Sequence, residues 1–187
     1  MADKIPTISE SALTNNGSRT VIHAVLAPGA TTFPPHHTLF SEKFTLLAGS
    51  ITVYTSPDMT EESFQAKALE IGESAIVPAG QLHNFLVGDE ETTNEVTFEP
   101  GNCDFERAIL IMKGTQGDDI YQQHGDLTPE NVIYMAVMSE LLNATALGQT
   151  KELLDGLYKT KGAEIEALKW KLVQKYASAE RMWEGVR

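Results

Sequence analysis

Short runs of alternating hydrophobic and polar residues occupy the first hundred positions of the chain. β-Branched and aromatic residues are frequent in these runs, and Gly, Pro, Asn or Asp separates one run from the next, which is typical of an all-β barrel or sandwich. The pattern predicts strands at residues 20–26, 42–54 (two strands around the turn Ala48-Gly49-Ser50), 64–71, 74–77, 82–87 and 93–98.

The pattern changes to a helical period near residue 103. Residues 104–113 place apolar side chains on one stripe that ends at Gly114. A second helix is expected to begin at Pro129, with Thr128 as its cap, and to run to about residue 148. A third helical stretch covers residues 150–183, with Gly162 as a potential break.

These patterns together predict three parts. Residues 1–17 form an N-terminal arm that could be exchanged between subunits as a swapped strand. Residues 18–102 form a β-barrel, and residues 103–187 form a helical extension that packs on the barrel or on a dimer partner.

Composition narrows the partners and the compartment. The chain has 187 residues with 42% hydrophobic content, which is enough for one well-cored domain. The net charge of −12 argues against nucleic acid and anionic membranes as partners. Cys103 is the only cysteine, and neither a signal peptide nor a long apolar run is present. We therefore expect a cytoplasmic protein that acts on a small molecule.

Candidate metal ligands occur in two segments of the predicted barrel. Residues 29–49 carry His37 and Glu42, and residues 72–83 end on His83. Imidazole and carboxylate groups suit divalent Fe, Mn, Zn, Ni or Co. Two histidines and one carboxylate with open positions are used by non-haem Fe(II) oxygenases and by zinc sites that activate water.

The strand pattern also predicts which residues line a pocket beside these groups. Glu42, Phe44 and Leu46 alternate along one predicted strand and share its inner face. We expect Phe44, Leu46 and Phe85 to line the pocket, with Glu42 at its mouth. His23, on the preceding strand, is a further candidate for the pocket wall.

At these residues the chain resembles the cupin superfamily, in particular small single-domain cupins with a helical C-terminal extension. The first cupin motif, Gly-x5-His-x-His-x(3–4)-Glu-x6-Gly, is matched by Gly29, His37, Glu42 and Gly49, but Pro35 stands at its first His position. The second motif, Gly-x5-Pro-x-Gly-x2-His-x3-Asn, is matched by Gly72, Pro78, Gly80 and His83, with Val87 at its Asn position. The resemblance covers residues 18–100 and implies a double-stranded β-helix, or jelly-roll, barrel.

In metal-binding cupins the residues that match His37, Glu42 and His83 are ligands, together with the first histidine of the motif. Pro35 has no donor side chain, which leaves three alternatives open. Three residues hold the metal; or His36 replaces the missing ligand through a local bulge; or the metal is lost and the pocket works without it.

The resemblance also implies dioxygenase, isomerase, decarboxylase or cyclase chemistry on a small, mostly apolar metabolite, such as an aromatic or polyketide-like compound. His37, Glu42 and His83 are then the expected catalytic residues as well as the ligands. In a metal-free enzyme Glu42 would be the general base, with His37 or His83 sharing proton transfer. A homodimer is expected in either case, and a non-catalytic barrel that binds a small ligand is the alternative.

Overall fold

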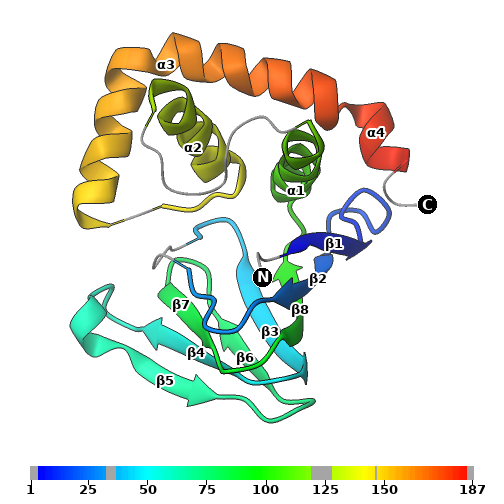
Figure 1. Ribbon diagram of the computed structural model, residues 1–187, viewed down its shortest axis with the longest axis vertical. Helices are drawn as coiled ribbons and strands as arrows, with labels where there is room; N and C mark the ends of the chain where they lie inside the picture. Colours follow the sequence, from blue (N-terminus) through cyan, green and yellow to red (C-terminus); the bar gives the residue numbers. More distant parts are fainter. Residues whose placement is uncertain (1–3, 33–36, 119–127, 146, 185–187) are drawn as a thin grey trace. The chain divides into compact units, whose positions relative to one another are not determined.

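The computed structural model describes residues 4–32, 37–118, 128–145 and 147–184, which form two compact units (Figure 1). The first unit, Met1–Cys103, contains the strands, and the second, Asp104–Arg187, contains the helices.

The strands of the first unit form two antiparallel sheets. The larger sheet has the order β1-β2-β8-β3-β6, with bounds Lys4–Glu10 (β1), Thr20–Leu26 (β2), Thr92–Glu99 (β8), Ser41–Ala48 (β3) and Ser74–Val77 (β6). The smaller sheet has the order β5-β4-β7, with bounds Gln65–Ala68 (β5), Ile51–Ser56 (β4) and Leu82–Val87 (β7). A short 3-10 helix, η1 (Glu61–Ser63), lies between β4 and β5.

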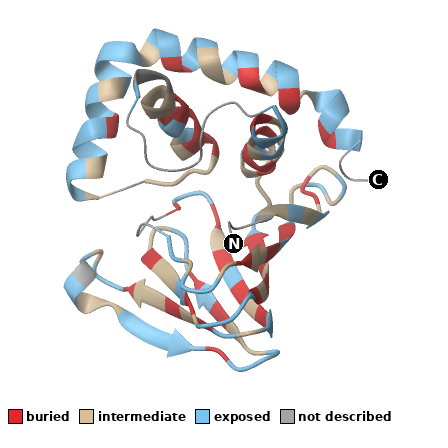
Figure 2. Ribbon diagram, in the orientation of Figure 1, coloured by how far each residue is buried: buried red, intermediate tan, exposed pale blue. Residues whose placement is uncertain are grey.

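Alternate residues of the strands are buried, which identifies the inner face of each sheet (Figure 2). On β3, Glu42, Phe44 and Leu46 are buried, whereas Lys43 is exposed. Phe44 and Phe85 come from different sheets, and their ring centroids lie 6.3 Å apart. The inner faces of the two sheets therefore meet, as the predicted jelly roll requires.

The predicted fold class, a jelly-roll barrel followed by helices, is confirmed. The strands expected at residues 74–77 and 82–87 have those bounds, and the expected run at 64–71 is shorter, because residues 70–73 form a turn closed by a 2.8 Å hydrogen bond from the Glu73 amide to the Glu70 carbonyl. Residues 4–10, expected in a swapped arm, form β1, which pairs with β2 of the same chain.

The second unit contains four helices: α1 (Cys103–Gly117), α2 (Pro129–Leu141), α3 (Gly148–Tyr176) and α4 (Ala179–Glu184). Its core is built from apolar residues of α1, α2 and α3, among them Ile111, Val137, Ile165 and Leu172. Thr128 caps α2 as expected, since its hydroxyl accepts a hydrogen bond from the Asn131 amide.

The helices differ from the sequence prediction at several points, including the stretch expected at 150–183, which ends as α3 at Tyr176 and resumes as α4 at Ala179. Helix α1 continues past Gly114, where a Cβ atom would lie 2.1 Å from the ring of Tyr176, so this glycine permits close packing. Helix α2 ends at Leu141, because Asn143 adopts a left-handed conformation with φ 50°. Helix α3 passes through Gly162 without a break. Among the described residues, no helix combines the length and the apolar composition needed to cross a bilayer.

Candidate metal centre

Glu42 enters the barrel interior from the larger sheet. It is the second residue of β3 and lies opposite Val77 of β6 and Phe98 of β8. Its side chain is on the same buried face as Phe44 and Leu46, as the alternation predicts. The carboxylate is therefore held inside the barrel by strand pairing on both sides.

His83 comes from the smaller sheet, on β7, and lies opposite Thr55 of β4. β7 pairs with β4, whereas β3 pairs with β6 and β8. His83 therefore reaches Glu42 from the opposite sheet, with its Nε2 atom 2.9 Å from Glu42 Oε2.

His37 lies in the connection between β2 and β3, outside any strand. The start of this connection runs along β7: Thr31 forms a bridge with Leu86, and its hydroxyl donates a hydrogen bond to the Phe85 carbonyl at 2.7 Å. His37 Nε2 lies 3.4 Å from Glu42 Oε1. Strand alternation therefore does not decide the orientation of His37, and Pro35 and His36, which bear on the expected fourth ligand, lie outside the described residues.

These three side chains form a compact buried cluster. One ligand atom from each lies within 4.8 Å of the others, and all three residues are less than 8% exposed. The carboxylate of Glu42 lies between the imidazoles, with one oxygen directed at each. The cluster brings together all three of the residues that the sequence singled out as ligands.

The ring of His83 is placed between two acceptors. Its Nδ1 atom lies 3.2 Å from the Gln81 carbonyl, and its Nε2 atom faces the Glu42 carboxylate. A neutral imidazole has only one N–H, so it can donate to the Gln81 carbonyl or to Glu42, but not to both. A second proton on the ring, or a cation at Nε2 with the Nδ1 proton donated to Gln81, satisfies both sides at once.

The electrostatics of the metal-free site agree with this geometry. Burial by itself lowers the pKa of His83, but the hydrogen bond and the negative charge of Glu42 outweigh burial, and the Gln81 carbonyl acts in the same direction. The resulting pKa of His83 is raised above its usual value. The site thus favours a positive charge at the position between His83 and Glu42.

Aromatic side chains surround the cluster on its inner side. The ring of Phe40 stacks on His37 with centroids 4.9 Å apart, and Phe44 lies 6.1 Å from the His83 ring. Phe44 and Leu46 are buried on the inner face, and Phe85 is half-buried. Phe40 was missed by the sequence reasoning, although an aromatic residue three positions after His37 was a usable signal.

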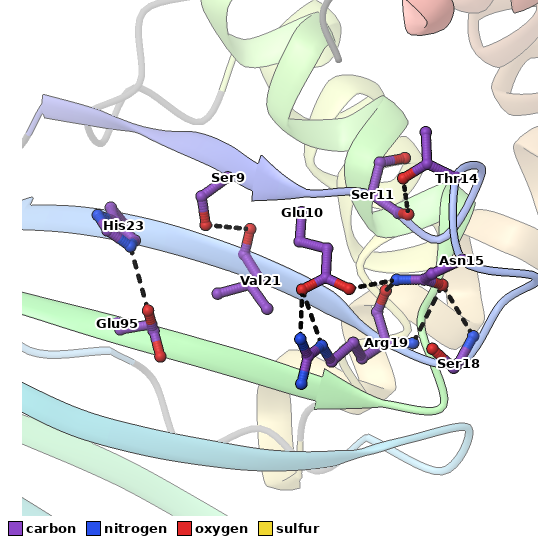
Figure 3. Close-up of polar contacts among 10 residues, drawn as sticks. All are labelled: Ser9, Glu10, Ser11, Thr14, Asn15, Ser18, Arg19, Val21, His23 and Glu95. Carbon is purple, nitrogen blue, oxygen red and sulfur yellow. Dashed lines mark hydrogen bonds and ion pairs between the residues drawn. The ribbon is translucent and has the colours of Figure 1, made fainter. Parts of the chain in front are cut away.

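His23 does not reach the cluster. It lies on the outer face of β2, is exposed, and forms an ion pair with Glu95 of β8 at 3.2 Å (Figure 3). The residues of β2 that face the barrel interior are Ile22, Ala24 and Leu26, which are out of phase with His23. The expectation that His23 could line the pocket is therefore corrected.

Two surface hollows lie elsewhere, among the helices of the second unit. The larger measures about 390 Å³ and is lined by residues including Arg107, Lys169 and Trp170, and the smaller measures about 230 Å³. Neither is lined by a residue of the buried cluster. Donor chemistry and burial, not hollow size, therefore mark the candidate metal centre.

The described residues of the first unit form a double-stranded β-helix of eight strands, in which the motif residues His37, Glu42 and His83 converge inside the barrel. It has the cupin fold. No protein-family model and no curated protein matches the sequence.

Solved structures similar to this cupin barrel include KdgF from Halomonas sp. (14% identity, 51% of this chain and 76% of that chain, TM-score 0.43). A second is an uncharacterized conserved protein with a double-stranded β-helix domain from Klebsiella pneumoniae (19% identity, 52% and 77%, TM-score 0.43). A third is the Cnp3 cupin domain of Schizosaccharomyces pombe (16% identity, 59% and 66%, TM-score 0.39), of which this chain spans slightly less than two thirds. Likeness at this level concerns the fold alone.

Proposed function

We propose that the cupin barrel binds one divalent metal ion through His37, Glu42 and His83 and acts on a small-molecule substrate at that ion. The observation that carries this proposal is the convergence of three buried ligand groups from β3, β7 and the β2–β3 connection. Burying ionisable side chains without a partner is costly, and a cation among them offsets that cost.

The spacing of the donor atoms fits such an ion. Metal–ligand distances of about 2.0–2.2 Å place neighbouring donor atoms roughly 2.8–3.1 Å apart in an octahedral site and roughly 3.3–3.6 Å apart in a tetrahedral one. The distances from Glu42 Oε2 to His83 Nε2 and from Glu42 Oε1 to His37 Nε2, 2.9 and 3.4 Å, are of this size. The Gln81 carbonyl supports the same conclusion, because an outer hydrogen bond to Nδ1 leaves Nε2 free as a ligand.

The donor set selects a class of ions rather than one member of it. Imidazole and carboxylate suit divalent Fe, Mn, Zn, Ni or Co, and two histidines with one carboxylate leave positions open for substrate. The bound ion would supply Lewis acidity toward a carbonyl, enolate or phenolate oxygen of the substrate.

The residues of the chain supply the remaining functions of the site. His37 and His83 bind the ion as neutral ligands, and Glu42 supplies the negative charge that balances it. The aromatic rings of Phe40 and Phe44 exclude water from the inner side of the cluster. Phe44 and Phe85 offer apolar contacts to a small, mostly apolar substrate, such as an aromatic or polyketide-like metabolite. Dioxygenase, isomerase, decarboxylase and cyclase reactions all fit this arrangement.

A metal-free acid–base enzyme is the second candidate, and the raised pKa of His83 favours it. A proton shared between His83 and Glu42 would occupy the position proposed for the metal, 2.9 Å from atom to atom. Glu42 would then accept a proton from the substrate while His83 or His37 donates one. Homodimerisation and a cytoplasmic location remain predictions for either candidate.

Metal analysis with matched histidine variants separates the two candidates. The protein is stripped with a chelator, equilibrated in turn with Fe(II), Mn, Zn, Ni and Co, freed of excess ion and analysed for metal. We expect roughly one equivalent of at least one ion in the wild type, its loss in His83→Ala, and its retention in His23→Ala, whose imidazole is exposed on the same unit.

No retained metal for any of the five ions would contradict the metalloenzyme proposal. The acid–base candidate then requires turnover in a screen of small carbonyl and phenolic compounds that is lost in Glu42→Gln. Ligand binding without turnover, unchanged in Glu42→Gln, would indicate the non-catalytic barrel instead.

A further inference from the structure

The turn between β6 and β7 contacts both histidines of the cluster, His37 through its backbone and His83 through its ring. The Gly80 amide donates a hydrogen bond to the His37 carbonyl at 2.5 Å. One residue later, the Gln81 carbonyl lies 3.2 Å from the Nδ1 atom of His83. Two consecutive residues therefore hold two imidazoles that come from distant parts of the sequence.

The conformation of this turn depends on glycine. The Gln81 amide donates to the Pro78 carbonyl at 3.1 Å, and Gly80 has φ +81°. This combination is a type II turn, whose third residue must have a positive φ. A Cβ atom on Gly80 would meet nothing within 4 Å. A side chain here would therefore strain the backbone without a steric clash against a neighbour.

His37 depends on this contact more than a strand residue would. Glu42 is fixed by the pairing of β3 with β6, and His83 by the pairing of β7 with β4, but His37 lies outside any strand. A metal site requires its ligands within about half an ångström of the productive geometry. If the hydrogen bond from the Gly80 amide to the His37 carbonyl were lost, a small displacement of the His37 backbone would move this ligand away from the other two.

We propose that Gly80 is a positioning residue of the metal centre: its turn fixes the backbone of His37 through the Gly80 amide and the ring of His83 through the Gln81 carbonyl. This inference rests on the proposed metal function. It assigns to Gly80 an effect on ligand geometry that is separate from any effect on the stability of the barrel.

The chain contains a close control for this test in Gly72. Gly72 has φ +86°, its Cβ position is also open, and its amide donates to the carbonyl of Leu46 at 2.8 Å. Leu46 lies four residues along β3 from Glu42, which is roughly 13 Å in an extended strand. Gly80→Ala and Gly72→Ala therefore strain similar turns, one at the cluster and one away from it.

Both alanine variants should lower the melting temperature of the metal-free protein by a similar amount, roughly 2–4 °C. Only Gly80→Ala should weaken Zn²⁺ binding, by about 10- to 100-fold in a competition titration with a chromophoric chelator. Gly72→Ala should bind within about twofold of the wild type. Gly80→Asn should recover part of the affinity, since asparagine tolerates positive φ, as Asn16 and Asn143 do in this chain.

Wild-type affinity in Gly80→Ala, or an equal loss in Gly72→Ala, would overturn the inference while leaving the metal proposal intact. If the wild type binds none of the five ions, the metal proposal fails. The placement of the His37 and His83 rings is then tested by ring-nitrogen NMR of the metal-free protein. The ring signals of His37 and His83 should then shift in Gly80→Ala and stay unchanged in Gly72→Ala, and unchanged signals in both variants would overturn the inference by themselves.

Discussion

Among the described residues, the interior of the β-unit contains three clustered ionisable side chains, whereas the buried residues of the helices are apolar apart from Glu106 and Thr115 of α1 and the hydroxyl groups of Tyr134 and Tyr176. Apolar burial in the helical core stabilises the fold directly. Burial of His37, Glu42 and His83 opposes folding unless a cation or proton balances the carboxylate. The clustering of these three groups is the reason for proposing that the chemistry occurs in the barrel.

The largest expected effect is a loss of stability when the helical core is disrupted. Leu172 of α3 is 3% exposed in the helical core, and Leu172→Ala leaves a cavity that should cost about 2–5 kcal/mol in the free energy of unfolding. Denaturant titration followed by the fluorescence of Trp170 and Trp183, both in this unit, measures the loss. Metal affinity should remain that of the wild type, and a large change in it would show that the chemistry is not confined to the barrel.

The next effect is the pH dependence that His83 gives to the stability of the barrel and to its affinity for Zn²⁺. In the metal-free protein the raised pKa of His83 means that its proton stabilises the fold. This contribution is fully present below the unfolded-state pKa of histidine, about 6.5, and is lost as pH rises through the higher folded-state pKa. Metal binding requires the neutral ring, so the affinity for Zn²⁺ should fall as pH decreases through the same window.

Thermal unfolding between pH 5 and 8, with and without Zn²⁺, measures both the pH dependence of the metal-free stability and the pH dependence of Zn²⁺ binding. The difference in melting temperature between the two samples should increase with pH. In His83→Ala it should be absent across the range, and a metal-dependent shift that persists in this variant would argue against His83 as a ligand.

The smallest effect compares the same substitution in the two units. Gly162 lies within α3 without a positive φ, and its Cβ position is open. Gly162→Ala should stabilise the protein by about 0.5–1 kcal/mol, because alanine has the higher helix propensity. Gly80→Ala should instead destabilise the protein. Destabilisation by Gly162→Ala in denaturant titration would show that this position has contacts beyond those of an exposed helix face.

The sequence was informative wherever local rules decide the structure. Alternation along residues 42–46 oriented Glu42 correctly, because strand pairing keeps the two faces distinct. The cap at Thr128 was predicted for the same reason, since side chain and backbone are close in sequence. The two motifs predicted the fold and the three residues that converge inside the barrel.

Features that depend on distant segments were less predictable. The orientation of His37 could not be derived from alternation, because its segment is not a strand and is held by the Gly80 amide. The end of α2 was missed because it depends on Asn143 adopting a left-handed conformation. His23 was misplaced because alternation alone does not say which face of β2 is inward; its pairing with Glu95 on β8 does.

X-ray absorption spectroscopy of the metal-loaded protein tests the central claim most directly. For Zn²⁺ the account predicts two imidazole nitrogens and one carboxylate oxygen at about 2.0–2.2 Å, with the remaining positions filled by light atoms from solvent. His23→Ala should give the same spectrum as the wild type, whereas His83→Ala should retain no metal and should therefore give no such first shell. A first shell without histidine, or one that is the same in the wild type and His83→Ala, would contradict the assignment of His37, Glu42 and His83 as the metal centre.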